Sequence, residues 1–570
     1  MTNKFKNNPD MTKYDYMYEC SKNNMNDIAL TFFNRKITYE ELHESIDKYC
    51  KMLISKGVRE GDRIGICTFN SPEAVYLIYA LDKIGALDFG LNPFDKPDKV
   101  RKDASDINPK MIITTDYSYG NFKDLDKTLN FDTLVYDPSK DSRSLVFKSL
   151  YKIGKLKNKT LFLPREILLS DALKDGKGVI IPELHLDPEK TSDIMFTGGS
   201  TGIHKGVELS SRGINYVVEG MRYLYDEDFF KGKTYLGQIP FGSMAFGRLL
   251  LHVALTNDMT YAATLKAMPK DFYEEMVRTK ANVVAGGPPH WTSLIETDSE
   301  GNYIPRRDLK EGSLSNLVLA TSGGEQKKDI TVPAINAAFK KCGSTAVLGD
   351  GLGATETWGN NILNSGHNYT EGLIGSPIST LEVRLVDENG NIVKKGEDGL
   401  LQLSGPTVMN GYYHNEEETN HSIIVDENGK RWFNTGDILQ EVSDNMYKYK
   451  GRKKRLFVCN VDNIYPEEIE NLLTTMPEIR EVVVTPISDD IQQFIPSYHI
   501  SLYSDQIDFD DFEKRMFSLI EEKVCHNALP QKIEYFTEPL VRMNNSKIDI
   551  NYYKERDTKN NPKSKMLKNE

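Results

Sequence analysis

Hydrophobic positions in the first part of the chain alternate between two spacings. Apolar residues recur at helical intervals in some segments and form short continuous runs in others; these segments are, in order, residues 39–53, 63–67, 71–84 and 111–114. Helices that alternate with short buried strands are typical of βαβ units around a largely parallel sheet. The alternation resumes after Asp193, with strand-like runs at residues 193–196, 283–285, 317–320 and 346–348. The pattern predicts an α/β fold.

The pattern changes past residue 380. Short alternating runs are separated by the turn sequences at residues 387–390 and 426–429, which predict hairpins and a small β-rich subdomain over about 380–450. A compact segment follows, with a helix predicted over 466–476 and a strand over 481–485. We therefore expect three parts: a large N-terminal domain of parallel-sheet subdomains plus the β-rich subdomain (1–450), a small mobile α+β C-terminal domain (451–553), and a flexible tail (554–570).

Composition and charge narrow the class of protein. The chain has 570 residues, of which 39% are hydrophobic and 27% charged, and its net charge of -12 disfavours nucleic-acid binding. Its six cysteines form no C-x-x-C pair, so neither a zinc site nor a disulfide framework is predicted. The amino terminus lacks the apolar core of a signal peptide, and we expect a cytoplasmic protein.

One segment combines flexibility with anion-binding groups. Residues 197–206 read T-G-G-S-T-G-I-H-K-G, directly after the predicted strand at 193–196. Glycines free the backbone N–H groups to face phosphate oxygens, the hydroxyls donate further hydrogen bonds, and Lys205 supplies charge. A Walker loop is excluded because His204 precedes the lysine and Gly206 follows it. The sequence predicts a polyphosphate site, with a plain Gly/Ser turn as the alternative.

Together with later segments in the same order, this loop resembles the adenylate-forming (AMP-binding) superfamily, and most closely its acyl-CoA synthetases and fatty acid–CoA ligases. The resemblance spans about residues 37–547 and implies ATP, Mg²⁺ and CoA as cofactor and co-substrates. The ATP phosphates are then expected at Thr197, Gly198, Gly199, Ser200, Thr201, Gly202 and Lys205. In residues 349–357, Thr355 would contact the α-phosphate and Glu356 would bind Mg²⁺.

The same resemblance assigns the nucleoside contacts and the moving parts. The adenine and ribose are expected at Gly323, Gly324, Glu325, Leu352, Gly353, Asp437 and Arg452. Leu352 stands where the family usually has an adenine-stacking aromatic residue. Lys454 is the expected hinge of the small domain, and Lys547 is the expected catalytic lysine, although Ser546 replaces the usual preceding glycine.

The acyl pocket is expected around Phe241, Ser243, Met244 and Gly286. Peptide-synthetase relatives carry an aspartate after the phenylalanine to hold the substrate's ammonium group, whereas Gly242 stands here and no carboxylate occurs between Pro240 and Leu255. A buried ammonium would be left unpaired. The predicted substrate is therefore a small-molecule carboxylic acid without an α-amino group, fatty or otherwise apolar.

The sequence predicts the acceptor of the acyl group less directly than it predicts the acid. Related CoA ligases have a small Ser-Gly or Gly-Gly step after the hinge, and this chain has Asn460 and Val461 there. CoA is the leading acceptor because no carrier-protein segment is attached. A ligase that delivers the acyl group to a separate carrier protein and a non-catalytic nucleotide-binding relative are the alternatives.

Residues 142–165 contain no acidic residue, and their lysines and arginines alternate with apolar side chains. Such a basic amphipathic stretch can rest on an anionic membrane surface, which would make the protein peripheral to the inner face of the membrane. The alternative is a helix whose apolar stripe packs on the large domain.

Overall fold

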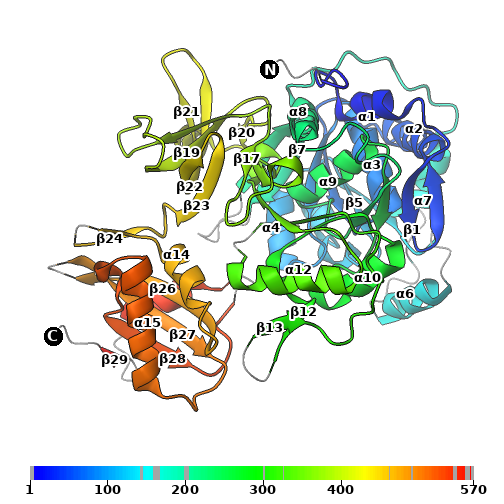
Figure 1. The fold of residues 1–570 in the computed structure, drawn as a ribbon. Coiled ribbons are helices and arrows are strands. Elements are labelled where there is room, and N and C mark those ends of the chain that lie inside the picture. Colours follow the sequence, from blue (N-terminus) through cyan, green and yellow to red (C-terminus); the bar gives the residue numbers. More distant parts are fainter. Residues whose placement is uncertain are drawn as a thin grey trace.

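The computed structural model confirms the predicted α/β class (Figure 1). Strands and helices from blue to green form a large body, the yellow β-rich part lies at the upper left, and the orange-to-red C-terminal part lies at the lower left. The structure describes residues 5–140, 145–157, 163, 167–197, 205–298, 302–324, 327–460, 462–489, 492–542, 548–558 and 565–566.

Two sheets of the body contain the parallel strands. In the described part of the chain, the first sheet has seven strands in the order β20 (Gly411–Tyr412), β8 (Lys205–Ser210), β7 (Thr191–Thr197), β4 (Leu87–Leu91), β3 (Arg63–Cys67), β5 (Met111–Thr115) and β6 (Asp132–Tyr136). Strands β7 to β6 are parallel, and β8 and β20 extend the sheet in antiparallel fashion. The segment predicted to bind phosphates thus begins at the carboxyl end of β7, an interior strand of its sheet, and ligand loops of such sheets lie at that end.

The second sheet has nine strands among the described residues. Their order is β17 (Ser376–Pro377), β16 (Ile362–Asn364), β15 (Leu348–Leu352), β14 (Leu319–Gly323), β11 (Val283–Gly286), β9 (Thr234–Gly237), β10 (Thr260–Ala263), β1 (Ile28–Phe32) and β2 (Arg35–Thr38). Strands β15 to β1 are parallel. The hairpin of β12 (Ile295–Thr297) and β13 (Tyr303–Pro305) lies outside both sheets.

The helices of the body are α1 (Lys13–Ser21), α2 (Tyr39–Ser55), α3 (Pro72–Lys83), α4 (Pro97–Ile107), α5 (Leu125–Leu129), α6 (Leu145–Lys157), α7 (Leu169–Asp175), α8 (Ser211–Met221), α9 (Ala245–Leu255), α10 (Phe272–Thr279), α11 (Pro288–Thr292) and α12 (Val332–Lys341). Four of these described helices begin at a side-chain cap: α1, α2, α3 and α8. Thr38 and Glu41 form a capping box on α2, and Ser71 caps α3 before Pro72. These two helices confirm the predicted segments 39–53 and 71–84.

Two predicted strands begin later than expected. The runs at 317–320 and 346–348 lead into β14 and β15, whose glycine-rich ends, predicted as turns, remain extended. Gly323 pairs with Gly351 across the two strands. Main-chain pairing between neighbouring strands needs no side chain, so glycine-rich segments can be strands when a partner is beside them.

The β-rich part is an antiparallel sheet. Its elements are β18 (Glu382–Val386), β19 (Asp398–Ser404), β21 (Ile423–Val425), β22 (Arg431–Ser443), β23 (Met446–Arg452) and the helix α13 (Glu416–Ser422). Gly390 and Gly429 have positive φ values of 85° and 77° in the two predicted turns. The hairpin predictions at residues 387–390 and 426–429 are therefore confirmed.

The C-terminal part has its own sheet and core (Figure 1). Its elements are β24 (Phe457–Cys459), β25 (Asp462–Ile464), α14 (Pro466–Leu473), β26 (Ile479–Asp489), β27 (Gln493–Leu502), α15 (Phe509–Lys523), β28 (Lys532–Phe536), α16 (Ile550–Thr558) and β29 (Lys565–Met566). The prediction of a flexible tail from residue 554 was wrong at its start, because α16 continues to Thr558 and the Asp557 side chain is 2% exposed. Few apolar residues occur there, and polar contacts hold the helix instead.

A buried group of four charged side chains links β7 to the elements packed beside it. Arg248 on α9 places Nη1 2.6 Å from Asp88 Oδ2 and 2.5 Å from Asp193 Oδ1, while Lys13 Nζ lies 2.5 Å from Asp193 Oδ2. None of these side chains is more than 2% exposed. Arg248 Nε also donates to the carbonyl of Phe241 at 2.8 Å. Two cations therefore neutralise two carboxylates, and they connect β4, β7, α1 and α9.

Removing the central cation of this group is predicted to destabilise the large body. Arg248→Met leaves Asp88 buried without its cation, which should lower the free energy of unfolding by about 3–5 kcal/mol. Lys395→Ala is the control, because its partner Asp444 is fully exposed and such surface pairs contribute about 1 kcal/mol or less. Chemical unfolding followed by tryptophan fluorescence measures both; equal shifts in the two variants would contradict the prediction.

Candidate active site

Lys205 and Glu356 meet around one tyrosine that the sequence analysis did not select. Lys205 begins β8, and its Nζ lies 5.0 Å from the centroid of the Tyr412 ring. The Tyr412 hydroxyl donates a hydrogen bond of 2.8 Å to Glu356 Oε1. Lys205 also forms an ion pair with Glu418 on α13. Burial raises the pKa of the Tyr412 hydroxyl, so it stays protonated and can act as this donor.

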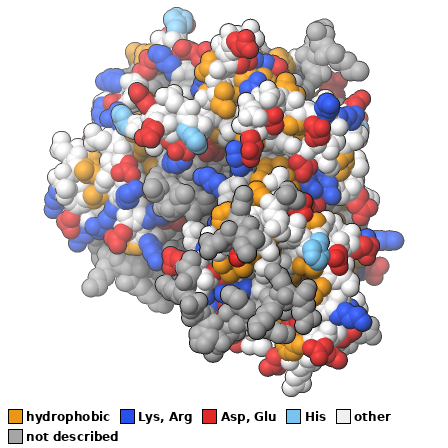
Figure 2. Space-filling model, turned by 90° about the vertical axis from the view of Figure 1, so that its left-hand side faces the viewer, with side chains coloured by type: hydrophobic (Ala, Val, Ile, Leu, Met, Phe, Trp, Pro, Cys, Tyr) orange, Lys and Arg blue, Asp and Glu red, His pale blue; other side chains and the backbone are white. Residues whose placement is uncertain are grey.

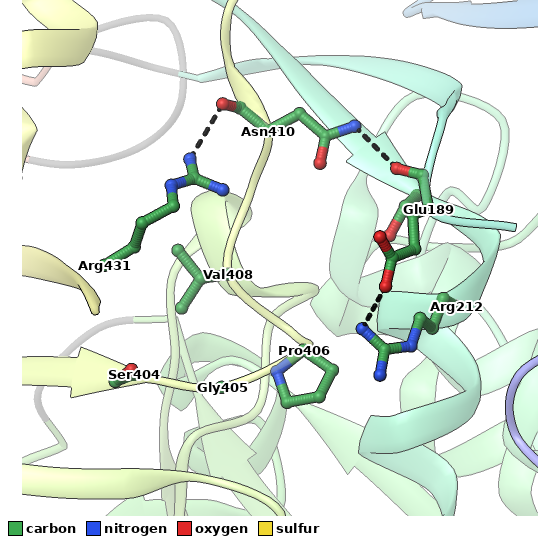
Figure 3. Close-up of a pocket in the computed structure, with 9 residues that line it drawn as sticks. Glu189, Arg212, Ser404, Gly405, Pro406, Val408, Asn410 and Arg431 are labelled. Carbon is green, nitrogen blue, oxygen red and sulfur yellow. Dashed lines mark hydrogen bonds and ion pairs between the residues drawn. The ribbon is translucent and has the colours of Figure 1, made fainter. Parts of the chain in front are cut away.

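The segment that leads into Tyr412 is fixed beside a small cavity (Figure 3). Asn410 Nδ2 donates to the carbonyl of Glu189 at 3.0 Å, and Arg431 Nη2 donates to the carbonyl of Asn410 at 2.9 Å. Arg212 Nη1 lies 2.7 Å from Glu189 Oε1 on the far wall. The cavity measures about 290 Å³, and none of the predicted site residues lines it. Its contacts instead fix Asn410, whose amide also donates to the carbonyl of Glu208 on β8; β20 begins at the next residue and pairs with β8, which sets Tyr412 beside Lys205.

Glu356 lies on a short 3₁₀ turn, Thr355–Thr357, that follows β15. Its carbonyl accepts a hydrogen bond of 2.8 Å from the amide of Met409. Just before the turn, a Cβ at Gly353 would lie 1.5 Å from the carbonyl oxygen of Gly359, so only glycine fits there. The backbone thus folds back on itself tightly, and this places both Thr355 and Glu356 at the carboxyl end of the parallel strand.

The predicted adenine-side residues lie on neighbouring strands. Gly323 ends β14 next to Gly351 of β15, and Gly324 follows with a positive φ of 84°. Leu352 is partly buried and packs against the main hydrophobic core. Four of the predicted adenine-side residues therefore lie together at the carboxyl ends of β14 and β15: Gly323, Gly324, Leu352 and Gly353.

Asp437 and Arg452 face each other across β22 and β23. Arg452 Nε lies 2.9 Å from Asp437 Oδ1, and Arg452 Nη1 donates to the carbonyl of Thr435 at 3.0 Å. The Asp437 side chain is 5% exposed. Burial raises the pKa of Asp437 to about 6, and Arg452 opposes this rise while the charge of Glu356 adds to it.

The residues predicted for the hinge and for the acceptor come shortly after Arg452 in the chain. Lys454 is exposed, in the turn between β23 and β24. Asn460 occupies the left-handed region, with φ of 55°, in the tight turn from β24 to β25. Its Nδ2 donates to Asn527 Oδ1 at 2.8 Å. Asparagine tolerates this conformation better than other non-glycine residues, so it can replace a glycine at such a turn.

The predicted acyl-pocket residues have contrasting environments. Phe241 is fully buried, with its ring edge-to-face to Tyr261 at a centroid distance of 5.9 Å, and so belongs to the core. Met244 is 47% exposed, Ser243 is partly buried, and Gly286 ends β11. The chain passes close to β4 at this point, where a Cβ at Gly90 would lie 2.2 Å from the carbonyl oxygen of Gly242.

Several predicted residues lie outside the part of the chain that the structure describes. Thr197 is described, at the end of β7. Outside the described residues are Gly198, Gly199, Ser200, Thr201, Gly202, Glu325, Val461, Ser546 and Lys547.

Tyr412 and Glu418 were missed because no motif of general chemistry marks them. Their sequence, G-Y-Y-H-N-E-E-E over residues 411–418, resembles an ordinary turn followed by an acidic helix start. Only the pairing of β20 with β8 reveals the contact with Lys205. A tyrosine directly before a capped acidic helix would have been the available signal.

Comparison with known proteins identifies the family. The model of the AMP-binding enzyme family matches residues 18–413, so the chain belongs to this family of adenylate-forming enzymes. The long-chain-fatty-acid–CoA ligase of Escherichia coli O6:H1 is 23% identical over 461 residues, which cover 79% of this chain and 78% of that protein. A probable 4-coumarate–CoA ligase of Dictyostelium discoideum is 24% identical over 447 residues, covering 78% and 77%.

The fold is shared with solved structures. ATP-bound MatB from Rhodopseudomonas palustris superposes with a TM-score of 0.78 at 20% identity, covering 96% of this chain and 99% of that one. The resemblance of the sequence to adenylate-forming enzymes and the predicted fold are therefore confirmed.

The raised pKa of Asp437 predicts pH-dependent nucleotide binding. A carboxylate accepts hydrogen bonds from both ribose hydroxyls only when it is ionised, so ATP affinity should fall as the pH drops below about 6. Asp437→Asn should weaken ATP binding about tenfold well above that pH. Because ATP itself titrates, the ratio of wild-type to Asp437→Asn affinity is the quantity to measure, by calorimetry.

That ratio should approach one below about pH 6. Asp444→Asn, at the exposed tip of the same β22–β23 hairpin, is the matched control and should bind ATP as the wild type does. A ratio independent of pH would contradict a role for Asp437 as a charged acceptor.

Proposed function

We propose that this chain is an acid–thiol ligase that activates a carboxylic acid with ATP and transfers the acyl group to CoA. The observation that supports it most is the contact of Lys205 and Glu356 with one residue, Tyr412, together with the buried Asp437 that Arg452 binds. A cation for phosphates, a carboxylate for a metal ion and a buried ribose acceptor are what nucleotide activation requires.

In the first half-reaction, a carboxylate oxygen of the acid attacks the α-phosphorus of ATP. The new O–P bond forms as the bond to the β-phosphate breaks, and pyrophosphate leaves. Lys205 and the 197–206 segment would hold the phosphates, while Lys547 would offset charge on the α-phosphate and the acid. Thr355 would orient the α-phosphate.

Glu356 would hold Mg²⁺, which supplies charge neutralisation for the departing pyrophosphate. Among the described residues there is no group of three or more metal-ligating side chains. This fits a magnesium ion that takes one carboxylate from the protein and its remaining ligands from phosphates and water. The hydroxyl of Tyr412 would fix the orientation of that carboxylate.

In the second half-reaction, the CoA thiolate attacks the acyl carbonyl carbon. The C–S bond forms, the bond to the AMP oxygen breaks, and AMP leaves. We propose that residues 451–553 rotate as a lid about Lys454, which withdraws Lys547 and brings the turn at Asn460 to the adenylate. The exposed turn at Lys454, between two sheets, suits such a pivot.

For the substrate we propose an acid without an α-amino group, fatty or otherwise apolar. Gly242 offers no carboxylate to an ammonium group, and none occurs between Pro240 and Leu255. The names of the relatives include a ligase for long-chain fatty acids and one for 4-coumarate. Delivery to a carrier protein instead of CoA is the alternative acceptor.

The activity is tested by pyrophosphate release with ATP and a panel of butyric, octanoic, dodecanoic, palmitic and benzoic acids, with and without CoA. We expect release with at least one acid, a thioester product with CoA, and loss of about a hundredfold or more in Lys547→Ala. Lys523→Ala, an exposed lysine of α15, is the control and should be unaffected. Adenylate without thioester would favour a carrier protein; no release with any acid would overturn the proposal.

We further propose that α6 contacts an anionic membrane surface, from which an apolar acid would be taken. Phe147 stacks on Phe33 with ring centroids 4.1 Å apart, and the Tyr151 hydroxyl donates to Asp116. One face of α6 therefore packs on the body, which is what the alternative prediction for residues 142–165 expects. The opposite face exposes Leu145 (79%) and Ile153 (50%).

Lys148 and Lys152 are exposed on that same face of α6, and residues 142–165 contain no acid to neutralise them. Apolar side chains flanked by lysines match the boundary between anionic headgroups and acyl chains. No helix in the described ranges is long and apolar enough to cross a bilayer, so the proposed contact is peripheral.

Co-sedimentation with phosphatidylglycerol vesicles tests this contact. The double charge reversal Lys148→Glu with Lys152→Glu should abolish binding at low salt, since each lysine near the surface contributes about 1 kcal/mol. Reversal of two exposed lysines on α12 and at the end of α10, Lys340→Glu with Lys280→Glu, is the control. Binding that survives the α6 reversal, or wild-type protein that does not bind, would contradict the proposal.

A further inference from the structure

A second candidate binding site is the cavity beside Asn410 (Figure 3). All of its lining residues are described, and none of them belongs to the predicted nucleotide or acyl site. It lies where the end of β8, the start of α8, the end of β19 and the start of β22 meet, so it joins the large body to the β-rich sheet. Its volume of about 290 Å³ is close to the lower limit of ligand pockets, about 300 Å³, and therefore suits a small molecule.

The two arginines that line this cavity differ in their partners. Arg212 is neutralised, because its Nε lies 2.6 Å from Asp10 Oδ1 and its Nη1 lies 2.7 Å from Glu189 Oε1. Arg431 donates to two main-chain carbonyls from Nη2, at 3.0 and 2.9 Å, and no carboxylate of the described chain forms an ion pair with it. Its Nε, its Nη1 and its positive charge therefore remain available to a ligand.

Two nearly buried hydroxyl groups also line the cavity. Ser404, at the end of β19, is 4% exposed, and its hydroxyl forms no hydrogen bond with another described residue. Ser210, at the end of β8, is 7% exposed; its hydroxyl oxygen accepts from the amide of Gly213 at 3.1 Å, which leaves its hydrogen to be donated. A buried hydroxyl that donates to nothing is unfavourable, so both groups favour a ligand that accepts hydrogen bonds.

The remaining lining residues restrict the kind of anion. The buried Val408 and Pro406 lie between Arg431 and Arg212 and add apolar surface (Figure 3). Glu189 is a carboxylate at the exposed rim, and its charge would repel a second negative charge inside the cavity. A singly charged, planar carboxylate with an apolar body matches these walls, because a guanidinium group pairs with a carboxylate through two parallel hydrogen bonds.

We propose that this cavity is a binding site for a small monocarboxylate, held by Arg431 and by the two hydroxyl groups. The inference goes beyond the proposed function and does not depend on it. Arg431 also holds the carbonyl of Asn410, two residues before Tyr412. A ligand on Arg431 would therefore stabilise the segment that leads to Tyr412, and exchange of the main-chain amides of residues 404–412 should slow.

Hydrogen–deuterium exchange of the full-length protein, without ATP, tests the site with butyrate as the probe. Chloride at the same ionic strength is the reference. We expect butyrate to slow exchange in peptides from residues 404–412, to saturation as its concentration rises. Butyramide has nearly the same shape without the charge, and sulfate carries two charges. Both should bind about tenfold more weakly than butyrate, or not at all.

Two variants test the individual groups. Arg431→Gln should weaken butyrate binding about tenfold or more, because it removes a charge-assisted pair. Ser404→Ala should weaken it about threefold and leaves the contacts of Arg431 with the main chain intact, so it tests the site even if Arg431→Gln does not fold. Arg59→Gln is the matched control and should bind butyrate as the wild type does. Arg59 is exposed and also donates to two main-chain carbonyls, at 3.0 and 2.8 Å, but it does not line the cavity.

Three results would overturn the inference. Butyrate that protects no peptide, or only peptides around the predicted acyl pocket at residues 241–244, would exclude this cavity as the site. Protection by butyramide or sulfate equal to that by butyrate would exclude recognition of a single carboxylate. Binding that is unchanged in both Arg431→Gln and Ser404→Ala would exclude these two groups as ligands. Pyrophosphate release, which tests the proposed function, enters none of these measurements.

Discussion

The arrangement of the large body depends on the charge balance around Arg248. Its guanidinium group joins two carboxylates from neighbouring strands of one sheet, and Lys13 completes the neutral set. Charges this deeply buried are tolerable only when each has its partner at hydrogen-bond distance. Because Asp193 precedes the predicted phosphate-binding segment by four residues and Arg248 holds the carbonyl of Phe241, this set fixes the start of that segment relative to the predicted acyl pocket.

The site is assembled from elements that are distant in sequence. The antiparallel strand β20 extends the parallel sheet and brings Tyr412 next to Lys205, while the turn after β15 in the other sheet supplies Glu356. The β-rich sheet contributes Asp437 and Arg452. Charges of both signs are mixed over the face of the molecule shown in Figure 2.

The sequence predicted those parts of the fold that local patterns determine. Caps and periodicity located α2 and α3, turn residues located the hairpins, and the order of motifs identified the family. It did not predict the glycine-rich ends of β14 and β15, because pairing between strands can stabilise glycine-rich segments that have no strand propensity of their own. Apolar character alone cannot distinguish a pocket wall from an interior, so the acyl-pocket assignment of Phe241, which packs in the main hydrophobic core, stays a prediction.

The ordering of residues 554–558 was also missed, for a related reason. Their composition is polar and resembles that of a solvated tail, yet the contacts of Arg556 and Asp557 come from strands that lie more than twenty residues earlier. Hydrogen bonds to residues distant in sequence produce no periodic pattern in the segment that forms them. The role of Tyr412 was hidden in the same way, because its partners come from elements far from it in sequence.

The ion pair between Lys205 and Glu418 has a consequence for ligand discrimination. The ammonium group already has a carboxylate partner in the free protein, so an incoming anion must displace that partner to reach it. A singly charged anion would merely exchange one negative charge for another. Under the proposed function, a chain of phosphates would bring several charges at once to this exchange, so the resting pair would favour a polyphosphate over a singly charged anion.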